Sequence, residues 1–142
     1  MDHKSVVDPV AAVVAALDGK DGTRWIGVDG KGATGKTRLA DRIAVALPSS
    51  VIVHIDDFAR PDVQGWERER FIRQVLKPLL AGRPGRYQRW DFDRNVGAEW
   101  HTVPSAVPVV VEGVSATDER LMVPWDFTIW VEVPYQVRLA RA

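Results

Sequence analysis

The chain has 142 residues, which is enough for one domain with a substantial core. Its 19 basic and 19 acidic residues cancel, so we expect no nucleic-acid partner. The absence of cysteine excludes disulfides, thiolate zinc sites and cysteine nucleophiles. No apolar run approaches the roughly 18 residues of a membrane span, and the first ten residues lack the pattern of a signal peptide. We therefore expect a cytoplasmic protein with no membrane partner.

Helical and strand patterns alternate along the whole chain. Asp8 and Pro9 suit the cap and first turn of a helix over residues 6–17. Apolar spacing predicts further helices over 37–47 and 66–80, with Pro78 expected to kink or shorten the last turn of the second of these. Apolar and β-branched runs predict strands over residues 24–29, 51–55, 107–111 and 127–133. Residues 82–85 are expected to form a break.

This alternation predicts a single α/β domain over residues 1–142, with a mostly parallel sheet. Right-handed crossovers would place helices on both faces of that sheet. Ligands of such sheets bind beyond the carboxyl ends of the strands, and each motif described below falls at such an end.

Residues 30–37 match the phosphate-loop pattern G-x-x-x-x-G-K-[ST], which gives the fold class as a P-loop NTPase. Glycines let successive backbone N–H groups point at phosphate oxygens, and the helix that follows directs its positive end at the same anion. Lys36 can reach the β- and γ-phosphates, and the Thr37 hydroxyl can bind Mg²⁺. The predicted nucleotide-binding residues are Gly30, Lys31, Gly32, Ala33, Thr34, Gly35, Lys36, Thr37 and Arg38.

Acidic residues follow two of the other predicted strands. Asp56 or Asp57 could accept a proton from a substrate hydroxyl, although a solvated Asp-Asp turn explains the pair equally well. Glu112 ends an apolar run in the manner of a Walker B strand, where an acid can hold Mg²⁺ through water. An ordinary acid at a strand end is the alternative for Glu112, but the neighbouring phosphate loop favours the metal site.

Arginines and aromatic residues lie between these acids, and five of the arginines and three of the aromatic residues are considered together. They could form a substrate pocket of flat rings and donors, or be surface arginines around one aromatic core cluster, and the sequence favours neither. His54 and His101 have no partner spacing that indicates a metal, so both are interpreted as structural. The segment comprises Arg60, Arg83, Arg86, Arg89 and Arg94 with Tyr87, Trp90 and Phe92.

Four segments in order resemble the uridine kinase branch of the P-loop kinases, which includes phosphoribulokinase and pantothenate kinase. The first is the phosphate loop (VDGKGATGKT). Residues 56–60 (DDFAR) resemble that family's D-x-F-x-R segment, whose first acid acts as the base on the accepting hydroxyl. Residues 90–92 (WDF) resemble its Y-D-F segment, whose aromatic packs on the substrate, and residues 111–114 (VEGV) its E-G segment near the metal. Uncharacterised bacterial proteins of this type, with WHTVP and a VEG strand, are more similar still.

The resemblance implies an ATP-dependent kinase that phosphorylates a hydroxyl of a small molecule, with a nucleoside among the candidate acceptors. Lys36 and the loop amides would neutralise the γ-phosphate, Thr37 and Glu112 would place Mg²⁺, and Asp56 would deprotonate the acceptor. The residues expected to shape the acceptor pocket are Asp57, Arg60, Tyr87 and Trp90. Two alternatives remain open: a nucleotide-dependent switch or binding module that needs no Asp56, and a simple NTPase in which Glu112 activates water.

The end of the chain carries a further expectation. A helix beginning at Tyr135 has no stop signal, and Arg138 and Arg141 correspond to the start of an arginine-bearing lid in the kinases that the chain resembles. We expect the lid and the last strand to be missing, so that the strand over 127–133 forms an exposed apolar edge. The natural protein would then continue past Ala142, or a partner chain, such as a second copy, would cover this edge.

Overall fold

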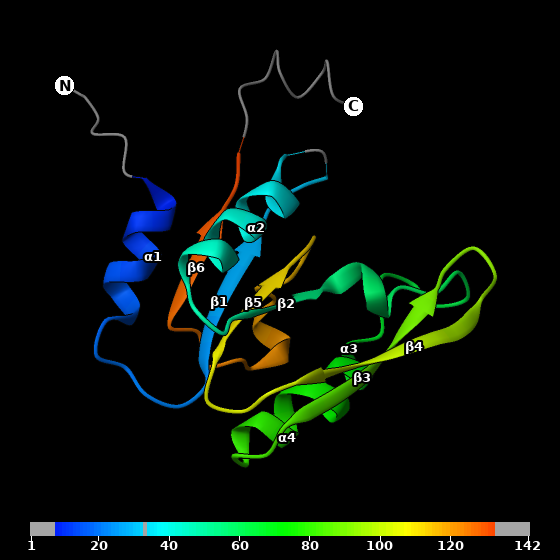
Figure 1. Cartoon of the computed structure of the whole chain (residues 1–142). Helices are drawn as coiled ribbons and strands as arrows, with labels where there is room; N and C mark the ends of the chain where they lie inside the picture. Colours follow the sequence, from blue (N-terminus) through cyan, green and yellow to red (C-terminus); the bar gives the residue numbers. More distant parts are fainter. Residues whose placement is uncertain (1–7, 33, 133–142) are drawn as a thin grey trace.

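A computed structural model describes residues 8–32 and 34–132 of the chain. Its centre is a sheet of four parallel strands in the order β2 (Val51–His54), β5 (Pro108–Glu112), β1 (Arg24–Asp29) and β6 (Phe127–Trp130). Val28 and His54 are both in register with Glu112, so three strands end at one edge of the sheet (Figure 1). The predicted α/β architecture with a parallel sheet is confirmed.

One face of the sheet is covered by α1 (Pro9–Leu17) and α2 (Lys36–Ala46), as Figure 1 shows. The predicted cap of α1 is present, because the Asp8 carboxylate accepts a hydrogen bond from the Val10 N–H at 3.0 Å. Apolar side chains of both helices pack on the strands in one cluster that includes Val13, Ile43 and Val110. The helices therefore bury the face that their spacing predicted.

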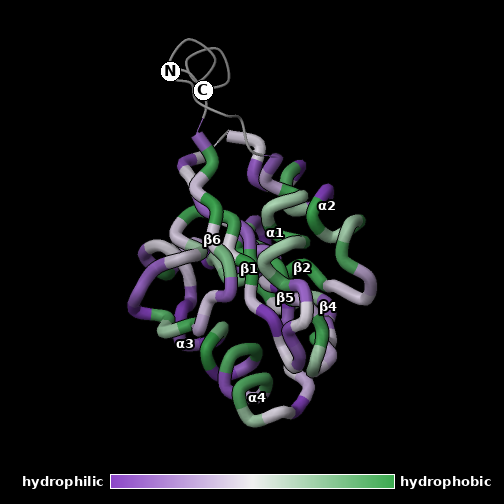
Figure 2. Tube along the Cα trace, turned by 90° about the vertical axis from the view of Figure 1, so that its left-hand side faces the viewer, coloured by the Kyte–Doolittle hydropathy of each residue, from purple (hydrophilic) through white to green (hydrophobic). Residues whose placement is uncertain are grey.

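The second face carries a larger core under shorter helical segments. The segment η1 (Ile55–Phe58), a 3-10 turn, follows β2 directly and places Phe58 in this core beside Phe71 and Tyr87. Another 3-10 turn, η3 (Glu119–Leu121), closes the cluster with Leu121. Helices thus cover both faces of the sheet, as expected from the sequence. Figure 2 shows the outer loops as largely hydrophilic and α4 as hydrophobic.

The helix predicted over residues 66–80 begins later and is uneven. It runs as α3 (Arg68–Phe71), a wider π-helical turn η2 (Ile72–Leu76) and α4 (Lys77–Leu80). The Lys77 N–H donates to the carbonyl of Ile72, five residues earlier. Pro78 has no N–H to offer and its ring would crowd the carbonyl four residues before it, so the wider turn lets the chain continue as a helix. Pro78 therefore perturbs the helix, as expected, but does not end it.

Residues 85–103 form an antiparallel hairpin that the sequence patterns did not reveal. Strand β3 (Gly85–Asp91) pairs with β4 (Val96–Val103) as a separate sheet (Figure 1). The predicted break over residues 82–85 is one residue shorter, because Gly85 is the first residue of β3. The two strands form a sheet of their own, so neither of them extends the parallel sheet.

Strand β6 is an edge of the parallel sheet in the part of the chain that the structure describes. It pairs with β1, and Trp130 near its end is 56% exposed. An apolar strand edge was the expectation for this segment, and β6 fits it. The predicted lid helix from Tyr135, with Arg138 and Arg141, lies outside the described residues. Among the described helices, none has the length and apolar character to cross a membrane.

Candidate functional site

The predicted phosphate loop connects β1 to α2. Gly35 adopts a left-handed conformation (φ 88°) at the cap of α2, where no side chain caps the helix, so the first amides of α2 are available to an anion. Lys36 is only 8% exposed, and its ammonium donates to the Lys31 carbonyl at 2.8 Å. The Thr34 hydroxyl donates to the same carbonyl at 2.8 Å. The loop thus curls around its own lysine; Ala33 lies outside the described residues.

The start of this loop is held by Asp29, which was not among the predicted site residues. Its buried carboxylate accepts hydrogen bonds from the N–H groups of Gly30 (2.6 Å), Ser115 (3.0 Å) and Thr117 (3.0 Å), and from the Thr117 hydroxyl (2.6 Å). Gly30 has a φ of 148°, and a Cβ there would lie 2.6 Å from the Val131 carbonyl oxygen. Asp29 therefore ties the phosphate loop to the loop after β5. The acid directly before the first motif glycine was the only sequence signal for it.

Glu112 and Thr37 meet at the carboxyl edge of the sheet. The Thr37 hydroxyl lies 3.4 Å from Glu112 Oε1, and the Glu112 side chain is almost fully buried. The other carboxylate oxygen, Oε2, lies 2.5 Å from His54 Nδ1. This hydrogen bond to Glu112 raises the pKa of His54 above its ordinary value of 6.5, against the opposing effect of burial.

His54 was interpreted as structural from the sequence, and the structure gives it a specific partner instead. His54 and Glu112 occupy the last positions of neighbouring parallel strands, so strand order rather than sequence spacing brings them together. The imidazole occupies one oxygen of Glu112 and leaves Oε1 on the side of Thr37. His54 is thus the residue that orients the predicted metal-binding acid.

The oxygen pair formed by Thr37 and Glu112 fits Mg²⁺. A hydroxyl and a carboxylate are the hard ligands that this ion prefers, and in phosphate-transfer sites it takes its other ligands from water and phosphate. Within residues 8–32 and 34–132, no group of three or more His, Cys, Asp or Glu side chains could hold a metal on its own. The arrangement therefore suits an ion that binds together with a nucleotide.

The two acids of η1 have different surroundings. Asp56 is exposed and lines a cavity of about 230 Å³. Asp57 is partly buried, and the Tyr87 hydroxyl donates to its Oδ2 at 3.4 Å. Burial raises the pKa of Asp57 above its ordinary value of 3.8 and also raises the pKa of Tyr87. Asp56 is thus the acid that an external molecule can reach.

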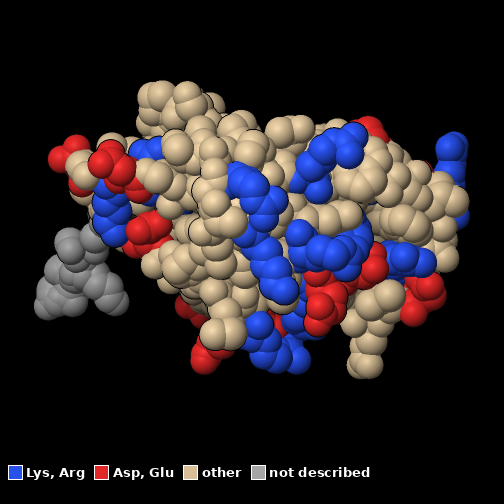
Figure 3. Space-filling model, turned by 90° about the horizontal axis from the view of Figure 1, so that it is seen from below, with Lys and Arg blue, Asp and Glu red and all other residues tan. Residues whose placement is uncertain are grey.

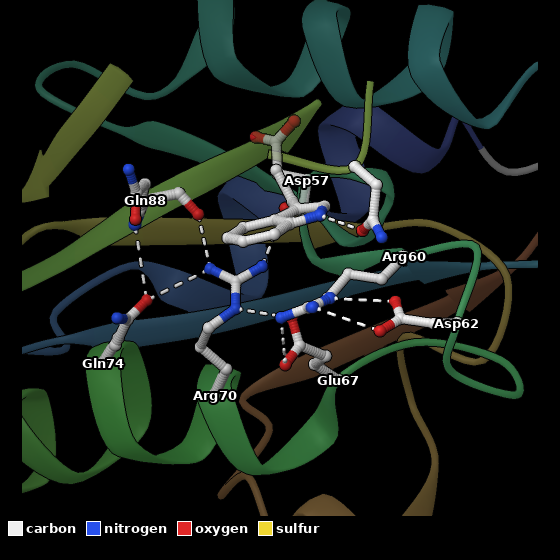
Figure 4. Close-up of polar contacts among 9 residues, drawn as sticks. Asp57, Arg60, Asp62, Glu67, Arg70, Gln74 and Gln88 are labelled. Carbon is white, nitrogen blue, oxygen red and sulfur yellow. Dashed lines mark hydrogen bonds and ion pairs between the residues drawn. The ribbon is translucent and has the colours of Figure 1, made fainter. Parts of the chain in front are cut away.

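The predicted acceptor residues Arg60 and Trp90 engage each other. The Arg60 guanidinium carbon lies 4.1 Å from the Trp90 ring centroid, and the Trp90 indole N–H donates to Asn95 at 2.9 Å. Arg60 also donates to both Asp62 oxygens at 3.2 Å and lies 3.8 Å from Glu67 (Figure 4). One face of the Trp90 ring is therefore covered by an arginine that is itself held by two acids.

Arg70 is a buried arginine on this side, and no motif indicated it. Its guanidinium donates to Glu67 (2.9 Å), to Gln74 (3.3 Å), to the Asp57 carbonyl (3.1 Å) and to the Gln88 carbonyl. Figure 4 shows it at the centre of these partners, which come from η1, from the helix and from β3. Arg70 thus joins the hairpin to the segment that carries the two acids.

The remaining residues of the predicted pocket divide between core and surface. Tyr87 is buried, with its ring 5.1 Å from that of Phe58, so it belongs to the aromatic core. Arg86 stacks on Trp100 at 4.4 Å, and Arg89 pairs with Glu99 at 2.6 Å. Figure 3, which views the molecule from below, shows basic and acidic side chains next to each other on that face. Tyr87, Arg86 and Arg89 therefore fit the second interpretation of this segment, surface arginines around an aromatic core cluster, and a substrate pocket formed by its other residues stays a prediction.

Comparison with known proteins gives similarity in structure and none in sequence families. No family model and no curated protein matches the chain. A Bacillus stearothermophilus protein described as a possible uridine kinase has a TM-score of 0.71 at 18% identity, over 93% of this chain and 82% of that one. A Silicibacter sp. TM1040 protein, provisionally described as a fructose transport system kinase, has a TM-score of 0.70 at 22% identity, over 93% and 76%. The chain therefore shares the α/β fold of these two proteins.

Proposed function

We propose that the chain is an ATP-dependent phosphotransferase that transfers phosphate to a hydroxyl of a small molecule. The observation that carries the proposal is the contact between Thr37 and Glu112 at 3.4 Å, directly after the phosphate-loop lysine. An accessible acid, Asp56, follows the strand next to that of Glu112. This combination provides a phosphate cradle, a metal-binding pair and a base at one edge of the sheet, as phosphoryl transfer requires.

The phosphate side would bind Mg-ATP through residues of the loop. Lys36 would release the Lys31 carbonyl and place its charge on the β- and γ-phosphates, while the amides at the start of α2 donate to phosphate oxygens. Bound Mg²⁺ would supply a positive charge that offsets the negative charge developing on the transferred group. His54 would keep Glu112 oriented toward Thr37 through its hydrogen bond to Oε2.

The acceptor side would supply the proton transfer. The hydroxyl oxygen of the acceptor forms a bond to the terminal phosphorus as the bond to ADP breaks, and Asp56 takes the hydroxyl proton. Asp57 is the poorer base candidate because its carboxylate is directed into contact with Tyr87. One structural neighbour is described as a possible uridine kinase and the other, provisionally, as a fructose transport system kinase, so a nucleoside or a sugar is a reasonable first acceptor to test.

A simple nucleoside triphosphatase is the second candidate, favoured by the close pair of His54 and Glu112. A carboxylate 2.5 Å from an imidazole could position and activate water instead of an organic hydroxyl. In that case Asp56 would be dispensable.

The test is a screen of hydroxyl compounds for acceptor-dependent release of ADP, with a pooled-metabolite assay read by mass spectrometry to identify a phosphorylated product. A kinase releases ADP in proportion to an acceptor and yields a product 80 Da heavier, the mass that one added phosphate group must contribute by the stoichiometry of the transfer. Turnover that is the same with and without every acceptor supports the triphosphatase. Tight nucleotide binding with no turnover of either kind points to a switch or binding module.

A further inference from the structure

A cavity lies next to Asp56, and none of the predicted acceptor residues lines it. Its volume is about 230 Å³, and its walls come from η1, from Trp66 and Arg68, and from the loop after β5 at Ser115. Sites for drug-sized ligands are larger, roughly 300–1,000 Å³. The cavity therefore suits a compact molecule.

Arg68 is the cationic residue of this cavity, and it has donors to spare. Its Nε donates to Asp118 Oδ2 at 3.0 Å, and its guanidinium carbon lies 5.5 Å from the Trp66 ring centroid. In the part of the chain that the structure describes, no hydrogen bond joins its two terminal nitrogens to a protein acceptor. Arg60 and Arg70, in contrast, use their terminal nitrogens on the protein. Arg68 is thus held in place at one nitrogen and able to bind a ligand with the others.

The charge around Arg68 favours an anion. Asp118 also accepts from Arg120 at 2.7 Å, so two guanidinium groups share one carboxylate and the trio keeps a net positive charge. Hydrogen bonding from Arg120 holds the pKa of Asp118 well below its usual range, so this carboxylate stays ionised and keeps Arg68 in place. Asp56 is among the residues that line the same cavity. The cavity therefore combines a cationic residue, Arg68, with a candidate proton acceptor, Asp56.

We propose that the acceptor is a compact hydroxylated anion, whose carboxylate or phosphate binds the terminal nitrogens of Arg68 while its hydroxyl faces Asp56. This inference rests on the proposed phosphotransferase function and makes Arg68 the residue that determines specificity. A guanidinium offers two parallel N–H donors that match a carboxylate or phosphate, which a neutral polyol does not use fully. Trp90 and Arg60 then hold the hairpin and do not contact the acceptor.

The first experiment measures binding and needs no turnover. The full chain, saturated with Mg²⁺ and a non-hydrolysable ATP analogue, is titrated calorimetrically with two matched pairs: glycerol with D-glycerate, and D-ribose with D-ribose 5-phosphate. We expect the anionic member of at least one pair to bind ten-fold tighter or more than its neutral partner, and the two pairs separate carboxylate from phosphate recognition. Equal or weaker binding of both anions overturns the inference.

Variants of Arg68 test whether the preference comes from this residue. Arg68→Gln should abolish the anion preference, and Arg68→Lys, which keeps the charge but not the paired donors, should restore part of it. Arg73→Gln removes an exposed arginine of the same helical segment and should change nothing. If Arg68→Gln folds and retains the full preference, the inference is wrong.

A kinetic measurement separates this inference from the proposed function. In the wild type, phosphate transfer to the anionic acceptor should show a KM at least ten-fold below that of the neutral one, and Arg68→Gln should raise that KM with little change in kcat. Anion preference in binding without any transfer would contradict the proposed function and leave the anion site standing. Efficient transfer to neutral acceptors only would support the function and overturn the anion site.

Discussion

The proposed phosphate side and the proposed acceptor side of this molecule are built in different ways. The phosphate side uses one contiguous segment, residues 30–37, whose backbone and lysine form the cradle. The proposed acceptor side is assembled from η1, the helix after it and the loop after β5, and buried hydrogen bonds of Arg70 join the hairpin to it (Figure 4). Chemistry carried by a backbone loop can be recognised in a sequence, whereas chemistry carried by packed side chains depends on the fold that brings them together.

The largest expected effect comes from Asp56→Asn on the acceptor side. It should lower kcat for phosphate transfer by about 10²–10⁴-fold, because the hydroxyl loses its base, and should leave the Kd for Mg-ATP near the wild-type value. Steady-state kinetics and calorimetry on the same preparation measure both quantities. Should transfer persist at a near wild-type rate, the base lies elsewhere and Asp57 is the next residue to test.

On the phosphate side, Lys36→Met should weaken Mg-ATP binding by about 10–100-fold, because charge-assisted hydrogen bonds to phosphate contribute roughly 1.5–3 kcal/mol. Calorimetric titration with Mg-ATP gives the Kd. Lys77→Met, at an exposed lysine of α4, is the matched control and should bind as the wild type does. Unchanged affinity in Lys36→Met would remove the phosphate loop from the proposal.

Arg70→Met should lower the free energy of unfolding by about 2–4 kcal/mol, because Glu67 and two backbone carbonyls lose a buried cationic partner. Urea unfolding followed by tryptophan fluorescence measures the loss. Arg73→Met, exposed on the same helical segment, should stay within about 0.5 kcal/mol of the wild type. Equal effects of the two substitutions would mean that the hairpin does not depend on Arg70.

Trp90→Ala tests whether Trp90 contacts the acceptor or only stabilises the hairpin. Loss of its stacking with Arg60 should lower the free energy of unfolding by about 1 kcal/mol. The KM for the acceptor should change less than about two-fold, because Trp90 does not contact the acceptor in the proposed arrangement. Urea unfolding and acceptor kinetics provide the two values. A large rise in KM with unchanged stability would mean that the acceptor contacts Trp90, as predicted from the sequence.

The smallest expected effect is a pH-dependent one at Asp57. Burial raises the pKa of Asp57 in the folded chain above the ordinary 3.8. The ionised carboxylate therefore destabilises the fold, with the full effect above the folded pKa and none below 3.8. Asp57→Asn should therefore raise the unfolding midpoint at pH 7 by roughly 1–2 °C after allowance for solvent screening, and the difference should close as the pH falls below 4. Thermal unfolding from pH 3.5 to 8 measures it. A difference that grows on acidification would reverse the assigned direction of the pKa shift.

The sequence predicted the central sheet and the helices α1 and α2 because their patterns are local. Strands β1 and β5 are buried on both faces and appear as continuous apolar runs, and α2 follows a loop whose glycines and lysine form a known motif. The same local information located Lys36, Thr37 and Glu112. Whether these residues act as proposed stays a prediction.

The hairpin and its contacts could not be predicted for a physical reason. Strands β3 and β4 bury few apolar side chains, chiefly Tyr87 and Val103, so their alternation is weak. Arg70 lies in the sequence run ERER, which by itself is typical of a solvated helix surface. Only the fold places the Gln88 carbonyl next to its guanidinium. The pairing of His54 with Glu112 similarly depends on strand order, which no spacing in the sequence states.

The carboxylate of Asp29 has a consequence for recombining this protein with others of its fold. It binds amides from two segments more than eighty positions apart, at Gly30 on one side and at Ser115 and Thr117 on the other. A chimera that exchanged residues 29–37 alone would place a foreign acid, or none, against native amides. The smallest exchangeable module is therefore a discontinuous cassette, residues 29–37 together with 113–118, and only a graft of both halves should keep its shape.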